Sequence, residues 1–163
     1  MCIRDRRKVP IDGFNRQSLN AKLAIAVTAN FVNYRTKEET SVEEISGISK
    51  QFNMKFFADI EKDKGISLEN IVYYKGDTHY FVMTALRNSL LSRGVLTQNF
   101  VNDRKSLMLG TNINWSELQA YAVDVAEYST KYLSNQIPTT EFALDPSGKP
   151  DVADFVFSFM YSA

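Results

Sequence analysis

Residues 70–86 constrain the fold more than any other stretch, because they hold two β-favouring runs joined by a Gly-Asp step. The segment reads NIVYYKGDTHYFVMTAL, the pattern of a strand, a tight turn and a returning strand. In the second run the side chains alternate between two faces, one with His79 and the other with Tyr80. Both faces are largely apolar. We therefore expect a hairpin covered by helices on one side and by a second domain or a ligand on the other.

Length, charge and cysteine content set the outer limits. A chain of 163 residues with 44% apolar residues suggests one domain with a real core. The 19 basic residues balance the 19 acidic ones, so the net charge gives no sign of a nucleic-acid or anionic membrane partner. The single cysteine excludes an internal disulfide and fits a reducing compartment. Because no apolar run approaches the roughly 20 residues of a membrane span, we expect a soluble chain.

The residues before the hairpin predict a strand and a helix. Residues 22–33 alternate in a way that favours a long strand. Residues 34–40 resemble a charged loop, and residues 43–47 an edge strand or turn. Residues 51–63 predict a helix that ends at Gly65. Its apolar stripe is expected to face the core rather than a cofactor, and it consists of Phe52, Phe56, Phe57 and Ile60.

The residues after the hairpin predict mainly helices and a last strand. Residues 87–93 and 95–109 are expected to form short helices, and residues 114–135 the longest helix, capped by Asn114 or Ser116. Short strands at 142–144 and 152–161 are expected on either side of a turn at 145–148. The pattern as a whole predicts an α+β fold, a mixed β-sheet with packed helices.

Few residues carry an obvious chemistry. The seven glycines are scattered, so neither a dinucleotide-binding fingerprint nor a phosphate-binding loop is present, and one histidine with one cysteine cannot build a zinc site. His79 beside Asp77 could form an acid-base pair, but in the absence of a third group a structural pair is the favoured interpretation. Tyr80 is either a core residue or a wall for a flat heteroaromatic ligand.

Four segments, taken in order, resemble the flavoprotein monooxygenase domain of the MICAL family, the actin-oxidising enzymes. The resemblance extends from about Val9 to the end of the chain, and the hairpin is its most specific part. The segments are KLAIAVTANFVN, EEISG, LENIVYYKGDTHYFVMTAL and FALDPSGKPDVADF. The resemblance implies a fold similar to p-hydroxybenzoate hydroxylase, FAD reduced by NADPH, and oxidation of methionines in filamentous actin so that filaments come apart. It also implies a cytoplasmic, cytoskeleton-associated protein.

The resemblance also assigns parts of the domain to this chain. Residues 7–163 would be the middle of the monooxygenase domain, mostly its substrate side, between the Gly-rich FAD fingerprint and a later Gly-Asp motif, and inactive by themselves. Residues 1–6, MCIRDR, are expected to be a non-native scar. The tyrosine of THYF, Tyr80, is carried over as an FAD contact and His79 only as its neighbour. No catalytic residue or metal ligand is assigned.

Two other interpretations remain open at this stage. A non-catalytic α+β module could bind a protein partner through the hairpin and the long helix. The segment could also be no functional unit at all, since a sheet cut in the middle exposes apolar edges that aggregate. The flanking sequence distinguishes these cases, because a Gly-rich FAD fingerprint upstream and a Gly-Asp motif downstream would support the enzyme.

Overall fold

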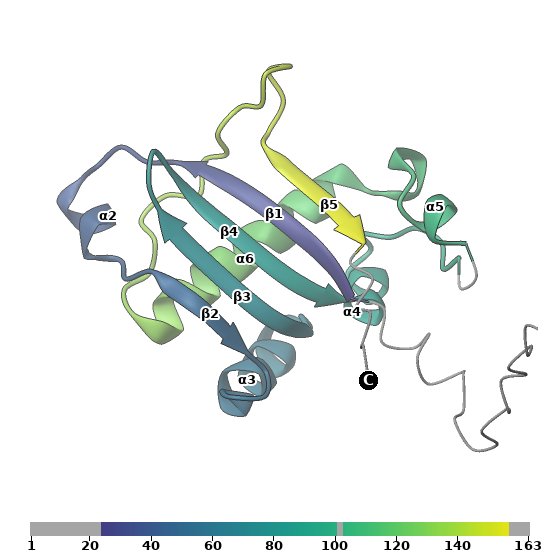
Figure 1. The fold of residues 1–163 in the computed structure, drawn as a ribbon, viewed down its shortest axis with the longest axis horizontal. Coiled ribbons are helices and arrows are strands. Elements are labelled where there is room, and N and C mark those ends of the chain that lie inside the picture. The colour runs from purple at the N-terminus through teal and green to yellow at the C-terminus, as the bar shows by residue number, and fades with distance from the viewer. Residues whose placement is uncertain (1–23, 101–102, 157–163) are drawn as a thin grey trace, which may run out of the picture.

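The computed structural model describes residues 24–100 and 103–156, and in them five strands form one antiparallel sheet (Figure 1). The strand order is β2-β3-β4-β1-β5. The predicted α+β class is confirmed, whereas the expected mixed sheet is wrong for the described strands, because all four pairings are antiparallel. The strands are β1 Ala24–Val32, β2 Ile45–Ser49, β3 Leu68–Lys75, β4 Thr78–Leu86 and β5 Val152–Val156.

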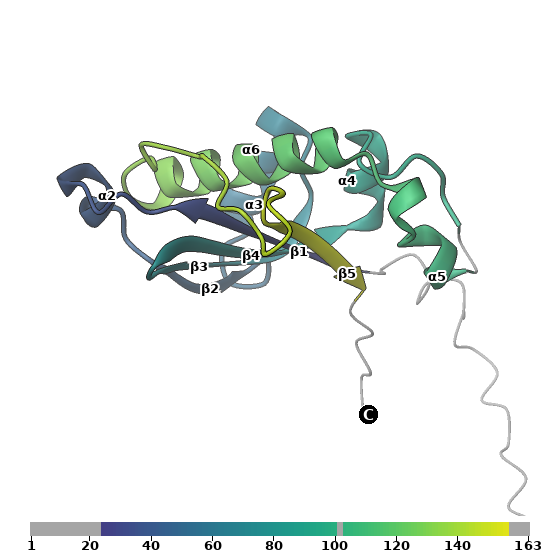
Figure 2. The same ribbon diagram turned by 90° about the horizontal axis from the view of Figure 1, so that it is seen from above.

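The main helices cover one face of this sheet. Figure 2 shows α6 lying along that face, with α3 and α4 on the same side. The helical elements are α2 Lys37–Ser41, α3 Met54–Lys64, α4 Arg87–Ser92, α5 Arg104–Leu107, the short 3-10 helix η1 Gly110–Asn112, and α6 Trp115–Leu133. Among the described residues, none of these helices combines the length and the apolar character that crossing a bilayer requires.

The hairpin predicted at residues 70–86 is confirmed as β3 and β4. Tyr73 pairs with Phe81 and Tyr74 with Tyr80, so odd-numbered and even-numbered residues of β4 lie on opposite faces. Strand β1 pairs with β4 along its whole length, which makes this apolar hairpin the centre of the sheet.

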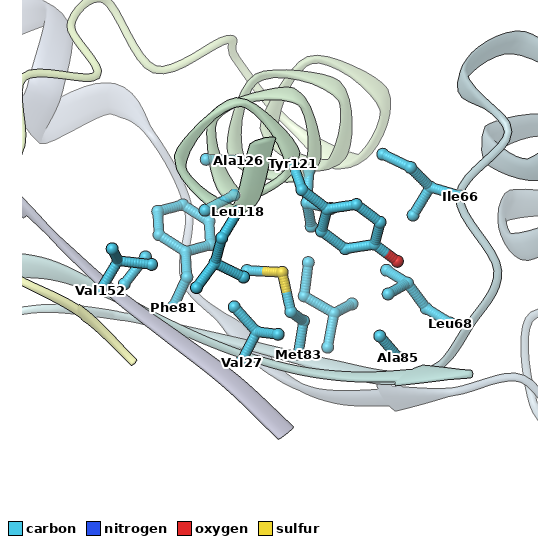
Figure 3. Close-up of a cluster of buried hydrophobic side chains, with 14 of the residues drawn as sticks. Val27, Ile66, Leu68, Phe81, Met83, Ala85, Leu118, Tyr121, Ala126 and Val152 are labelled. Carbon is cyan, nitrogen blue, oxygen red and sulfur yellow. The ribbon is translucent and has the colours of Figure 1, made fainter. Parts of the chain in front are cut away.

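The core lies between the sheet and α6. Val27, Phe81 and Met83 point from the strands toward Leu118 and Tyr121 of the helix (Figure 3), and all five side chains are fully buried. Burying a large apolar side chain contributes about 1.5–3 kcal/mol, so this layer supplies much of the driving force for folding. The alternation in β1 and β4 and the helical spacing in α6 therefore meet at a single interface.

The ends of the long helices follow their caps. Asn53 begins α3 by accepting a hydrogen bond from the Phe56 amide, and Gly65 ends it with φ 66°, a left-handed conformation that suits glycine. Asn114 caps α6, as predicted. Phe56 is buried with the rest of the predicted stripe, but Phe52 precedes the cap and is 84% exposed, so its assignment to the core was wrong.

Several connecting segments differ from the predictions. Residues 34–40 contain all but the last residue of α2, where Thr36 and Glu39 form a reciprocal capping box that stabilises even a short helix. Within 95–109 the described residues form only α5, because loop contacts to Asn112 replace further helical turns. Residues 142–144 make isolated bridges rather than a strand. The expected strand 152–161 is present as β5, and its remainder lies outside the described residues.

The second face of the sheet has no covering layer among the described residues. We call it the open face and define it by six residues of β1, β3 and β4: Thr28, Asn30, Val72, Tyr74, Tyr80 and Val82. Tyr74 is 52% exposed, and the other five are half-buried. This arrangement leaves room for the second domain or ligand that the sequence predicts, and that occupant stays a prediction.

Candidate functional site

The two predicted site residues lie on opposite faces of β4. His79 is fully buried beneath the helices, whereas Tyr80 is half-buried on the open face. Adjacent residues of a strand point in opposite directions, so the two side chains cannot line one site. The open face and the buried histidine are therefore two separate arrangements.

Tyr80 lies in the middle of a row that crosses the sheet. Asn30 of β1 and Tyr74 of β3 are its cross-strand partners. The next row contains Val82 and Val72, which extend the same surface with apolar groups. A tyrosine ring on a rigid strand, flanked by apolar side chains and a few polar groups, is typical of a surface that binds a flat ring.

Asn30 supplies the fixed polar groups of this row. Its Oδ1 accepts a hydrogen bond from Thr78 Oγ1 at 2.6 Å, and its Nδ2 donates to Asp151 Oδ2 at 2.9 Å. Sequence reasoning missed Asn30 and Asp151. The polar position inside an apolar strand was the available signal, but its neighbours depend on pairings between distant segments.

His79 has different partners from the one predicted. Its Nδ1 lies 2.7 Å from Tyr73 Oη, and its Nε2 lies 3.3 Å from Glu39 Oε1. Asp77 instead pairs with Arg35 at 3.0 Å on the surface. The predicted His79–Asp77 pair is therefore wrong, because the turn directs Asp77 to solvent while the strand directs His79 under α2.

The protonation states around His79 follow from these partners. Burial raises the pKa of Glu39, but hydrogen bonds from the Thr36 and Tyr34 amides and from His79 outweigh it, and the net pKa is lowered. Burial lowers the pKa of His79, with Glu39 opposing. The carboxylate only accepts, so the neutral imidazole donates from Nε2 and accepts at Nδ1 from Tyr73, whose pKa burial raises.

This buried group is sealed from the open face. The exposed fractions of the His79 and Glu39 side chains are 0% and 1%, and Tyr73 is also fully buried. General acid-base chemistry needs a group within reach of a substrate, so we assign the trio a structural role. It anchors α2 to the sheet close to the β3–β4 turn.

A shallow cleft lies where α6 begins, next to the turn that precedes β5. Trp115 and Gln119 of the helix line it together with Lys149. The carboxylate of Asp145, which also lines the cleft, accepts hydrogen bonds from the Ser147 and Lys149 amides. These hydrogen bonds stabilise the turn at residues 145–149 and occupy the Asp145 carboxylate. Across residues 24–100 and 103–156, no three His, Cys, Asp or Glu side chains gather closely enough to hold a metal ion.

Comparisons with known proteins show what the chain is similar to. A family model described as "Mical, Rossman domain" matches residues 23–156. The F-actin-monooxygenase MICAL2 of Homo sapiens is 46% identical over 159 residues, 98% of this chain and 8% of that protein. The protein-methionine sulfoxide oxidase mical3a of Danio rerio is 47% identical over the same shares. The F-actin-monooxygenase mical1 of Danio rerio is 48% identical over 152 residues, 93% of this chain and 12% of that protein.

The chain corresponds to a small part of each relative, and its described sheet is not of the doubly wound type. The chain spans only about a tenth of the length of these relatives, since the covered shares are 8% and 12%. The model's description contains the word Rossmann, yet the described sheet is wholly antiparallel. A doubly wound dinucleotide-binding unit needs parallel strands joined through helices, so the described residues are not such a unit by themselves.

Proposed function

The chain belongs to the MICAL family, and from this premise we propose that it is a middle segment of an FAD- and NADPH-dependent monooxygenase domain. Its substrate would be methionine residues of filamentous actin, whose oxidation promotes filament disassembly. The names of the relatives, F-actin monooxygenase and protein-methionine sulfoxide oxidase, support this substrate. A cytoplasmic, cytoskeleton-associated location follows from the same proposal.

The observation that carries the proposal is the open face with Tyr80 at its centre. A half-buried ring among valines, with an oriented amide beside it, fits the planar ring system of a flavin. The described glycines form no phosphate cradle, so this segment would meet the ring, and the pyrophosphate would depend on other parts of the domain. The resemblance to the substrate side of p-hydroxybenzoate hydroxylase belongs to the same proposal.

The contribution of this segment would be orientation and exclusion of water. Bound FAD supplies hydride acceptance from NADPH and the activation of oxygen. Tyr80 would hold one side of the ring, and Val72 and Val82 would keep water away from it. His79, the weaker of the two assigned residues, would act on FAD binding only indirectly. Its hydrogen bonds to Glu39 and Tyr73 would hold in place the strand that carries Tyr80.

An interaction module is the second candidate, favoured by one observation. Phe52, in the turn before α3, and Met54, the first residue of α3, are 84% and 71% exposed. Backbone hydrogen bonds from Phe52 and Asn53 to the Ser49 carbonyl hold this turn rigidly. Exposed apolar side chains on a rigid turn are typical of protein contacts, and such contacts need no cofactor.

Substitution of Tyr80 tests the flavin assignment. In the flavin domain of the full-length protein, Tyr80→Ala should raise the Kd for FAD about tenfold, because the ring contact is lost. Tyr80→Phe keeps the ring and should stay within about threefold of the wild type. The Kd would be measured by titrating apoprotein with FAD and following the quenching of flavin fluorescence.

Tyr132→Ala is the matched control, since Tyr132 is a partly exposed tyrosine on α6, away from the open face. It should leave the Kd for FAD unchanged. Equal, unimpaired FAD binding and kinetics in both Tyr80 variants would remove Tyr80 from the site.

A further inference from the structure

Asn30 joins three segments at the edge of the open face. Its backbone amide donates to the Asp151 carbonyl at 3.0 Å, and its own carbonyl accepts from the Ala143 amide at 2.9 Å. Its side chain bonds Thr78 of the hairpin and the Asp151 carboxylate. The position of this side chain is therefore fixed from both sides of β1.

The orientation of the Asn30 amide follows from its partners. A carboxylate accepts hydrogen bonds, so the NH₂ group of Asn30 faces Asp151 Oδ2. The carbonyl oxygen of Asn30 then faces the Thr78 hydroxyl, which can donate. The two ends of the amide are not interchangeable at this site.

One hydrogen of this NH₂ group remains after the bond to Asp151. Nδ2 carries two hydrogens, and the bond to Asp151 uses one of them. Among the described residues, the bond to Asp151 is the one hydrogen bond that Nδ2 donates. Asn30 is half-buried and lies directly across from Tyr80, at a Cβ separation of about 5 Å for such a pair. A half-buried donor can bond water in the free protein and exchange that water for an acceptor of a ligand.

We propose that Asn30 is a ligand-binding residue of the open face. It donates its remaining amide hydrogen to a carbonyl oxygen or an unprotonated ring nitrogen of the flat heteroaromatic ligand that lies against Tyr80. This inference rests on the proposed function, in which the ligand is the flavin ring of FAD, whose pyrimidine portion carries such acceptors. Thr78 and Asp151 act as positioning residues for Asn30.

Exchanging the side chains at positions 30 and 151 distinguishes a role of Asn30 in ligand binding from a role in folding. We call this double variant the swap. In the double variant Asn30→Asp with Asp151→Asn, the amide at position 151 donates to the carboxylate at position 30, and Thr78 keeps its acceptor. The bond between the two positions is restored, but position 30 no longer has a donor for the ligand. We expect folding to be kept and the Kd for FAD to rise about tenfold, because a carboxylate also repels acceptor atoms.

The control is Asn112→Ala, which removes an asparagine whose amide donates both of its hydrogens within the protein. Asn112 is 4% exposed, bonds Thr97, Gln98 and Leu107 within and beside η1, and is not one of the residues of the open face. It should lower the thermal stability of the domain without changing the Kd for FAD. Asn30→Ala should both lower stability and raise that Kd.

The outcomes are measured on the full-length flavin domain by FAD titration and thermal unfolding of the apoprotein. A stable swap variant with weakened FAD binding supports the donor role. A swap variant that binds FAD as tightly as the wild type overturns it and leaves Asn30 structural. If Asn30→Ala does not fold, the swap still decides. A wild-type domain that binds no FAD at all instead overturns the proposed function, and the donor role with it.

Discussion

Replacing Phe81 with alanine is expected to lower the free energy of unfolding by about 3–5 kcal/mol. Phe81 is fully buried at the centre of the sheet. Its ring stacks on the ring of Tyr73, with 4.4 Å between centroids, and makes an edge contact with the ring of Phe31, with 5.8 Å between centroids. Alanine would leave a cavity between the hairpin and α6, and both ring contacts would be lost. Because domains have about 5–15 kcal/mol of stability, this is among the largest effects of one substitution.

Val82→Ala provides the matched control for that substitution. Val82 follows Phe81 directly but is half-buried on the open face. Its truncation should cost about 1 kcal/mol or less in the apoprotein, because its methyl groups already contact solvent. Guanidinium unfolding of both variants measures the difference. Equal losses would contradict the assignment of the two faces.

Replacing Glu39 with alanine should cost about 3–4 kcal/mol. Its carboxylate accepts hydrogen bonds from the Tyr34 and Thr36 amides and from His79 Nε2, and these donors are left without an acceptor. The capping box of α2 is lost at the same time. Glu38→Ala, one position earlier and exposed, should change the unfolding free energy by about 0.5 kcal/mol or less.

The buried pair of His79 and Glu39 makes the stability of the protein sensitive to acid. The folded-state pKa of His79 lies below its ordinary value of 6.5, so the unfolded chain binds a proton first and stability falls as the pH drops below about 6.5. The folded-state pKa of Glu39 lies below 4.5, so its contribution is present above about pH 4.5 and is lost as the pH falls through the folded-state pKa. His79→Gln keeps a donor and an acceptor and should flatten the profile between about pH 6.5 and 5. A wild type that gains stability over this interval would contradict the neutral buried histidine.

The regular elements could be predicted from local patterns. Alternation in residues 22–33 and 70–86 predicted β1, β3 and β4, and helical spacing with an asparagine cap predicted α6. The loop assigned to residues 34–40 shows the limit of composition, because charged residues obscured the helix. The Thr36–Glu39 capping box was the physical signal that could have identified α2.

The sites depended on contacts that no local pattern contains. His79 meets Glu39, 40 positions away, and Asn30 meets Asp151, 121 positions away. The alternation correctly separates His79 from Tyr80, but it does not say which face the helices cover. Asn30 and Tyr80 become neighbours only through the pairing of β1 with β4.

The most direct test of the central claim is the rate of NADPH consumption by the flavin domain of the full-length protein, with and without filamentous actin. A yellow, FAD-loaded protein whose NADPH oxidation rises with actin, while methionine sulfoxide appears on the filament, is the result we predict. A colourless, well-folded protein with no NADPH turnover would contradict the enzyme and favour the interaction module.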